Sequence, residues 1–357
     1  MILAKKRKVL ARLGKKKTRI KLILNSGNNR TKKKEISMKN LLKTVLLSTL
    51  SFSSFSMEKV LDYKTAQIVE FKSGAEGFDT RTFFYVTPSE VVAIDSQFTP
   101  KLAEESIKYL RTFTDKPITT LIITHPNPDK FNGASVFKKL GANIISSKST
   151  SDAIPVVHQY KKYYFVEIAK MFTNENYPEP TLVDSIFIDE KVITLMNNDT
   201  LILKELKNPG VSSTQTVIFS KNKNALFVGD LVHHKAHAWL EGGIVAGKPV
   251  PTIDGWISDL MELKTLYPSN PIVYGGRGLS VILKKAVKAQ VTYLKKSLEI
   301  IKNEIKTNRM TKKDLGSELE KTFNAELEKR FVSEFPDYQL PYMITYGSYG
   351  LVQSLLK

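Results

Sequence analysis

Hydrophobic and polar residues alternate along the chain with two periods, and the β-branched runs predict the strands. Residues 81–86 and 91–95 are two such runs, and the turn Thr87-Pro88-Ser89-Glu90 between them predicts a hairpin. Residues 118–124 form an unbroken β-branched run, which is typical of a strand buried on both faces. Further strands are expected at residues 66–71, 143–146, 185–188, 201–206, 215–220, 225–228 and 272–274.

Apolar residues that recur every three or four positions predict the helices. A helix is expected to begin at Thr99 and Pro100, because proline is favoured in the first helical turn. It continues to about residue 112. Other helices are expected at residues 133–140, 151–172, 254–267 and 280–307, and the last 50 residues are helical as well. Each of the two β-rich halves is followed by helices, so we expect an α/β protein built as a four-layer αββα sandwich.

The composition is that of a soluble folded protein, and it excludes several chemistries. Hydrophobic residues make up 42% and charged residues 25%, which argues against a fibrous or wholly disordered chain. The sequence has no cysteine, so disulfides, thiolate zinc sites, iron–sulfur clusters and a cysteine nucleophile are excluded. It also lacks a Gly-x-Ser-x-Gly elbow and a phosphate-binding glycine loop.

The positive charge is concentrated at the start of the chain. The formal net charge is +19, but residues 1–37 hold fourteen Lys or Arg and a single acid, Glu35. Residues 57–357 carry a net charge of only about +4, an ordinary value for a soluble domain. We therefore expect no nucleic-acid partner for the body of the protein.

Residues 38–56 predict a secretory signal peptide. Met38, Lys39 and Lys43 open a short apolar stretch that ends in small residues near Ser56. The stretch is too short for a stable membrane span, so a periplasmic or secreted protein is expected after cleavage. Residues 1–37 are then either a basic disordered extension or codons that precede the true start. Two folded parts follow: a main domain at residues 57–306 and a helical C-terminal extension at residues 307–357.

Polar residues follow three of the predicted strands. The carboxyl ends of strands are where α/β proteins bind their ligands. The first segment is Thr124-His125-Pro126-Asn127-Pro128-Asp129-Lys130, the second is Gly229-Asp230, and the third is Gly275-Gly276-Arg277-Gly278. Three such strand ends, separated by about 100 and 50 residues, are typical of a metal-dependent hydrolase.

These segments resemble the metallo-β-lactamase fold superfamily over residues 67–306. Further marks of that family are the hairpin end Ala93-Ile94-Asp95 and the segment from Leu226 to Leu231. The resemblance implies that His125 is the first histidine of the family's His-x-His-x-Asp-His loop. It also implies that Asp129 is the loop aspartate and Asp230 the aspartate that bridges two metal ions.

The family's other ligand positions are not preserved. Asn127 replaces the second loop histidine, Lys130 the fourth loop residue and Arg277 the final histidine. The family's later-strand histidine would fall near Val211, where this sequence has no histidine. Because lysine and arginine cations cannot ligate a metal, a conventional dinuclear zinc site is not expected. Lys130 and Arg277 can instead replace the metal charge beside Asp129 and Asp230, leaving a salt-bridged relic of the site.

A rearranged site with one metal ion is the alternative. Three of the five histidines, His233, His234 and His237, lie within eight residues of Asp230. Imidazole and carboxylate groups are ligands for zinc or another divalent metal. The candidate ligands are His125, Asp129, Asp230, His233 and His237.

Two functions therefore remain open. The first is hydrolysis of a small anionic ester, amide or sulfate, with His125, Asp129 and Asp230 as the catalytic residues. The second is a protein without catalysis that binds an anionic small molecule in the former metal groove. In either case the expected substrate- or ligand-binding residues are Asn127, Lys130, Arg277, His234 and Trp239.

Overall fold

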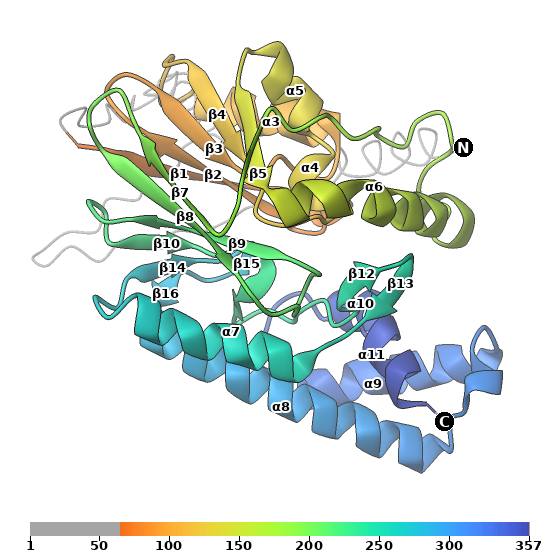
Figure 1. Cartoon of the computed structure of the whole chain (residues 1–357). Coiled ribbons are helices and arrows are strands. Elements are labelled where there is room, and N and C mark those ends of the chain that lie inside the picture. Colours follow the sequence, from red (N-terminus) through yellow and green to blue (C-terminus); the bar gives the residue numbers. More distant parts are fainter. Residues whose placement is uncertain (1–64, 357) are drawn as a thin grey trace, which may run out of the picture. The chain divides into compact units, whose positions relative to one another are not determined.

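The computed structural model describes residues 65–356, so the predicted signal peptide and the basic segment before it lie outside the described residues. The described part begins with a six-stranded sheet in the order β1-β2-β3-β4-β5-β6 (Figure 1). The first three strands are antiparallel, and β3 to β6 are parallel. Its strands are β1 (Gln67–Lys72), β2 (Arg81–Val86), β3 (Val91–Ile94), β4 (Ile118–Ile122), β5 (Asn143–Ser147) and β6 (Ser185–Phe187).

A second six-stranded sheet packs against the first, in the order β16-β14-β10-β9-β8-β7. Its strands are β7 (Glu190–Thr194), β8 (Thr200–Leu206), β9 (Gln215–Ser220), β10 (Ala225–Phe227), β14 (Ile272–Tyr274) and β16 (Val281–Ile282). Two short pairs complete the strands of the described residues: β11 (His233–His234) with β15 (Arg277–Gly278), and β12 (Gly243–Val245) with β13 (Lys248–Val250).

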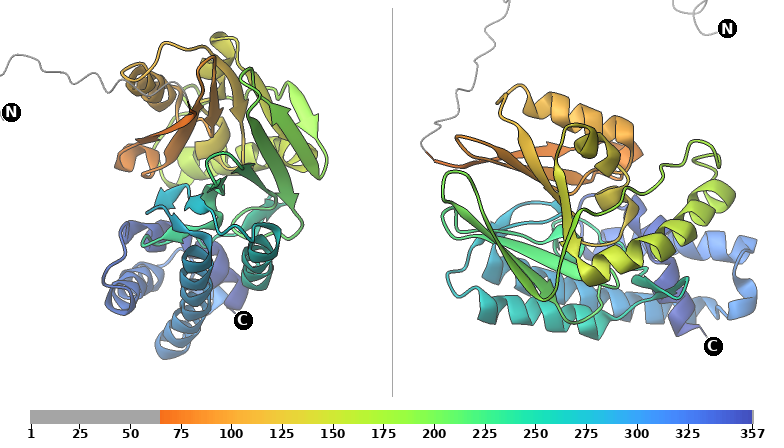
Figure 2. Two further views of the ribbon diagram at one scale, coloured as in Figure 1. Left: turned by 90° about the vertical axis from the view of Figure 1, so that its left-hand side faces the viewer. Right: turned by 45° about the horizontal axis from the view of Figure 1, so that its top comes forward.

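Helices cover the outer face of each sheet, as the two views of Figure 2 show. On the first sheet lie α3 (Pro100–Leu110), α4 (Pro128–Phe131), α5 (Ala134–Lys139) and α6 (Lys148–Tyr163), which continues as a π-helix, η3 (Tyr164–Ile168). On the second lie α7 (Ile253–Leu266) and α8 (Leu283–Asn308). The expected four-layer αββα sandwich is therefore confirmed.

Strand β2 shows how the alternation of side chains builds these layers. Phe84 points into the core between the first sheet and α3 and α5, whereas Phe83 and Tyr85 point into the core between the two sheets. On the far side of the second sheet, Trp256 and Leu260 of α7 belong to the core that the sheet shares with its helices.

The C-terminal residues are helical, as predicted, and they pack into the same core as α7 and α8. The helices are α9 (Glu318–Glu334), α10 (Tyr342–Gly347) and α11 (Tyr349–Leu355). Phe323, Phe331 and Leu351 of these helices are buried in the cluster that contains Trp256. The boundary expected at residues 306 and 307 stays a prediction.

The structure differs from the sequence expectations in small elements. Strand β7 was not expected; its side chains alternate between half-buried and exposed, as on the edge of a sheet. The long helix begins at Leu283 because Val281 and Ile282 pair with β14 as an edge strand. No helix among residues 65–356 is long and apolar enough to cross a bilayer.

Candidate functional site

The three polar segments converge at one edge of the sandwich. His125 lies just beyond β4, and Asp129 and Lys130 belong to the short helix α4 that follows it. Asp230 lies in the turn η4 (Gly229–Leu231) after β10, and Arg277 is in β15 after β14. Strands β4 and β10 belong to different sheets, so the site lies where the two sheets meet.

Asp129, Lys130, Asp230 and Arg277 form a closed ring of ion pairs, which we call the four-charge cluster. Lys130 Nζ lies 2.8 Å from Asp129 Oδ2 and 2.9 Å from Asp230 Oδ1. Arg277 Nη2 lies 3.0 Å from Asp129 Oδ2, and Nη1 lies 2.8 Å from Asp230 Oδ2. Each carboxylate therefore pairs with both cations, and the formal charges cancel.

The four-charge cluster is buried and its hydrogen bonds are nearly all used. Lys130 is fully buried, and Arg277 is only 4% exposed. Arg277 Nε donates to the carbonyl oxygen of Phe78, and Arg277 Nη2 also donates to Thr80 Oγ1. Thr80 in turn donates to Asp129. Such pairing is what makes the burial of four charges tolerable.

The cluster changes the proton affinity of its own members. Burial alone would raise the pKa of Asp129, but the Lys130 and Arg277 cations beside it hold that pKa well below its ordinary value. The pKa of Asp230 is lowered in the same way: the cations outweigh its desolvation. Both carboxylates are therefore ionised and weakly basic at neutral pH.

Gly276 allows the backbone to approach the cluster closely. A Cβ atom at this position would lie 2.1 Å from Asp230 Oδ1 and 3.0 Å from Lys130 Nζ. Any larger residue would push the carboxylate and the ammonium apart. The glycine turn that resembles the family's last ligand loop thus holds the ion pairs together.

These residues do not fit the two-zinc site that the family resemblance implies. The ammonium of Lys130 lies between the carboxylates of Asp129 and Asp230, and the guanidinium of Arg277 contacts both of them. Ammonium and guanidinium groups offer only N–H donors and repel a cation. Residues 65–356 also contain no group of three or more His, Asp or Glu side chains placed to hold a metal ion.

His125 and His233 approach the cluster from the interior. His125 Nε2 lies 3.6 Å from Asp230 Oδ2, and His233 Nε2 lies 3.7 Å from Asp230 Oδ1. The Nδ1 atom of His233 contacts the carbonyl oxygen of His237, which can only accept, so Nδ1 carries the proton. Neither Nε2 has a hydrogen-bond partner among the described residues.

Of the three histidines that follow Asp230, His234 and His237 lie apart from the four-charge cluster. His237 is packed among the rings of Tyr293, Phe331, Phe335 and Tyr338, where burial lowers its pKa to about 4. His234 is buried beside β15, where it pairs with Gly278. Both positions are explained by packing.

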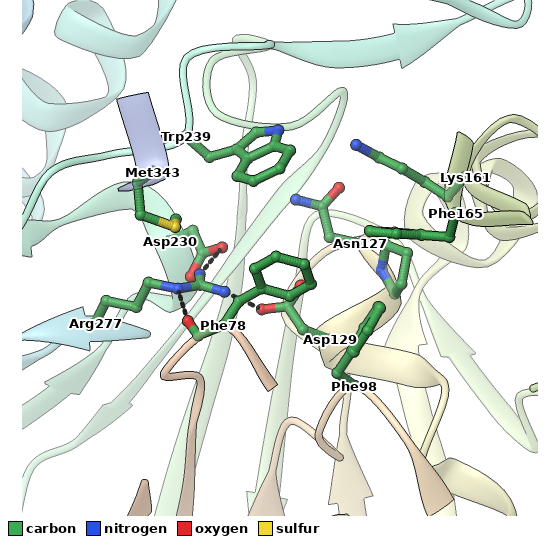
Figure 3. Close-up of a pocket in the computed structure, with 11 residues that line it drawn as sticks. Phe78, Phe98, Asn127, Asp129, Lys161, Phe165, Asp230, Trp239, Arg277 and Met343 are labelled. Atoms are coloured by element: carbon green, nitrogen blue, oxygen red, sulfur yellow. Dashed lines mark hydrogen bonds and ion pairs between the residues drawn. The ribbon is translucent and has the colours of Figure 1, made fainter. Parts of the chain in front are cut away.

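A pocket opens above the cluster (Figure 3). Of the expected site residues, Asn127, Asp129, Asp230, Trp239 and Arg277 line it. Lys130 and the histidines do not belong to its lining. The remaining lining residues are Phe78, Phe98, Pro128, Lys161, Phe165 and Met343.

These additional lining residues could hardly be predicted from local sequence patterns. Lys161 lies near the end of α6, and Phe165 lies in η3, which continues it; no site residue was predicted in this region. The aromatic run from Tyr160 to Phe165 was the one local signal for a pocket wall. Met343 comes from α10, more than a hundred residues after Asp230 along the chain.

The two facing sheets and the helices on their outer faces define an αββα sandwich with a polar site at one edge. The family model of the metallo-beta-lactamase superfamily matches residues 76–273, more than half of the chain. The chain therefore belongs to the metallo-beta-lactamase superfamily, which confirms the resemblance seen in the sequence.

Solved structures of similar fold are metallo-beta-lactamases. One from Pontibacter korlensis is 15% identical, with a TM-score of 0.49, and the match covers 65% of this chain and 99% of that chain. FIM-1 from Pseudomonas aeruginosa, solved in a mono-zinc form, is 13% identical, with a TM-score of 0.48 and coverage of 65% and 91%. No curated protein sequence matches the chain.

Replacing Lys130 by methionine tests the cluster. Lys130→Met keeps a long side chain but leaves Asp129 and Asp230 with one cation, so we expect a loss of about 3 to 5 kcal/mol in the free energy of unfolding. Lys138→Met, which removes an exposed ion pair with Asp184, is the matched control and should cost at most about 1 kcal/mol. Urea unfolding measures both, and equal small losses would contradict the account.

The effect of Lys130→Met should also depend on pH. A carboxyl whose pKa is lowered on folding adds stability above its ordinary pKa, here 3.8, and loses it as the pH falls toward the lowered value. The difference in the free energy of unfolding between wild type and Lys130→Met should therefore be largest near pH 7 and should decrease below about pH 4. Urea unfolding at pH 7 and pH 3 measures this difference. An equal difference at both pH values would show that Asp129 and Asp230 do not cause it.

Proposed function

We propose that this chain binds a small organic anion in the pocket above the four-charge cluster, without a resident metal and without turnover. The observation that carries the proposal is the position of Lys130 Nζ, within 2.9 Å of both Asp129 and Asp230. The side chains that would hold metal ions are already paired with two cations. The pocket itself remains, with aromatic walls and polar groups from several elements.

The chemistry of the cluster supports binding rather than catalysis. A general base works best when its pKa lies near the working pH. Asp129 and Asp230 line the pocket, but their pKa values are lowered, so they are poor bases. Asp129 Oδ2 and both oxygen atoms of Asp230 also contact Thr80, Lys130 or Arg277.

Hydrolysis of a small ester, amide or sulfate is the second candidate. The observation that favours it is the pair of unpartnered Nε2 atoms on His125 and His233, which face Asp230. Both histidines are almost fully buried, and neither lines the pocket. A base at these positions would have no direct contact with a bound molecule, and we therefore favour the binding function.

A fragment screen in EDTA tests the proposal. The melting temperature of wild type should not change when EDTA is added, because no metal contributes to folding. Fragments should still bind, as measured by ligand-observed NMR. Met343→Trp, which fills the pocket, should abolish this binding, whereas Met261→Trp at an exposed position of α7 should retain it.

Two results would overturn the proposed function. One is the absence of any fragment that Met343→Trp displaces. The other is a clear drop in melting temperature with EDTA, together with a metal content that falls in His233→Ala, which would favour a metal-dependent hydrolase.

We also propose that the protein is exported and that its mature form begins near Met57. The support is the short positive start, apolar stretch and small residues of segment 38–56. Intact mass of the natively expressed protein should show a chain that starts close to Met57, outside the cytoplasm. A soluble cytosolic species that retains residues 1–56 would contradict export.

A further inference from the structure

The pocket contains a second buried ion pair, separate from the four-charge cluster. Lys161 of α6 lines the pocket, is 4% exposed, and pairs with Glu241, which is also 4% exposed. Trp239 Nε1 donates to Glu241 Oε2 at 2.8 Å, and Tyr160 Oη donates to Glu241 Oε1 at 2.9 Å. Glu241 therefore fixes three side chains at this wall.

Lys161 has more unused donors than Arg277. An ammonium group has three N–H donors, and Glu241 is the one hydrogen-bond acceptor for Lys161 among the described residues. Its Nζ otherwise lies 5.2 Å from the ring of Trp239 and 5.6 Å from the ring of Tyr160. Arg277 already donates from Nε, Nη1 and Nη2.

Asn127 offers further free donors on the same pocket. Its side-chain amide has no hydrogen-bond partner within residues 65–356, and it is partly exposed. In Figure 3, Lys161 and Asn127 lie on the side of the pocket away from Arg277 and Met343. Most of the unused hydrogen-bond donors of the pocket are therefore gathered at one end.

Aromatic rings form the apolar part of the pocket. The ring centroid of Phe78 lies 5.1 Å from that of Phe98, 5.8 Å from that of Phe165 and 5.9 Å from that of Trp239. Phe98 and Phe165 are 5.0 Å apart. Such walls favour a flat apolar or aromatic group.

The charge around the pocket limits the charge of the ligand. Lys130 and Arg277 neutralise Asp129 and Asp230, and Lys161 pairs with Glu241, so these side chains carry no net charge. A dianion such as a phosphate monoester would find one incompletely paired cation and no net positive charge to balance it. A single negative charge on two oxygens matches one ammonium and one amide.

We infer that the ligand is a monocarboxylate with an aromatic or flat apolar group. Its carboxylate accepts from Lys161 Nζ and the Asn127 amide, and its apolar group packs against the wall that Phe78, Phe98, Phe165 and Trp239 form. The inference rests on the proposed binding function, and it places the anion contact at Lys161 rather than at Lys130 and Arg277.

Matched probes test the inference with the intact protein. Phenylacetate, 2-phenylethanol, 2-phenylethylamine and phenyl phosphate share one ring and differ in the polar end. By ligand-observed NMR titration, phenylacetate should bind at least about tenfold more tightly than the other three, which is the effect of one charge-assisted hydrogen bond.

Paired variants separate recognition from folding. Lys161→Met alone would leave Glu241 buried without its cation, so Lys161→Met/Glu241→Gln removes both charges. This double variant, and Asn127→Leu separately, should weaken phenylacetate about tenfold and 2-phenylethanol hardly at all. Lys162→Met/Glu179→Gln removes the neighbouring exposed ion pair on α6 and should change neither affinity.

The outcomes distinguish this inference from the proposed function. If fragments bind in the pocket but phenylacetate has no advantage over 2-phenylethanol, the carboxylate assignment is wrong and the binding function stands. Tighter binding of phenyl phosphate, or equal weakening of the acid and the alcohol by the double variant, also overturns it. If no fragment is displaced by Met343→Trp, both proposals fail.

Discussion

Two carboxylates at the meeting edge of the sheets require positive charge within hydrogen-bond distance. Asp129 follows β4 in the first sheet, and Asp230 follows β10 in the second, so the sandwich brings two buried negative charges together. Left unpaired, such charges would cost several kcal/mol each. Lys130 and Arg277 supply the compensating charge and allow the two sheets to close at this edge.

Side-chain cations satisfy this requirement differently from metal ions. A metal offers open coordination positions and can activate a bound water molecule. An ammonium and a guanidinium offer only donors, and here the carboxylates, Thr80 and the Phe78 carbonyl oxygen occupy most of them. The four-charge cluster therefore forms a fixed, neutral floor of the pocket, and recognition depends on the walls above it.

The main architecture could be predicted from the sequence because the buried strands have strong local patterns. Residues 118–124 and 215–220 are β-branched runs that few other structures accommodate. Strand β7 has only the short β-branched run Val192-Ile193-Thr194, and it is a half-exposed edge strand whose pairing with β8 decides its conformation. Strands β11 and β15 consist of two residues each, too few for any periodic signal.

The candidate site could be predicted in part. His125, Asp129 and Asp230 stand at strand ends with recognisable neighbours, and the pairing of Lys130 and Arg277 with the two acids follows from charge. The clustering of histidines near Asp230 suggested ligands, yet His237 lies in an aromatic cage built by residues 293–338. Contacts of this kind depend on tertiary packing of α8 and α9 and leave no mark near the histidine itself.

The same dependence extends to the pocket walls. Phe78, Phe98, Lys161 and Met343 come from four distant parts of the sequence, and each is an ordinary residue in its own segment. Their common role appears only when α6 and α10 are in place. Sequence patterns report the local environment of an element, whereas a pocket is defined by what lies across from it.

The position of Arg277 along the chain sets the order in which the protein can mature. Its partner Asp129 lies 148 residues earlier in the sequence. Tyr342 donates a hydrogen bond to Asp79, which lies 263 residues before it. During synthesis the Asp129–Lys130 pair emerges long before Asp230 and Arg277, so the floor of the pocket cannot be neutralised until most of the chain is made. Contacts this distant in sequence slow folding. A chain interrupted between Asp230 and Arg277 would therefore be left with an unmatched negative charge at the sheet edge.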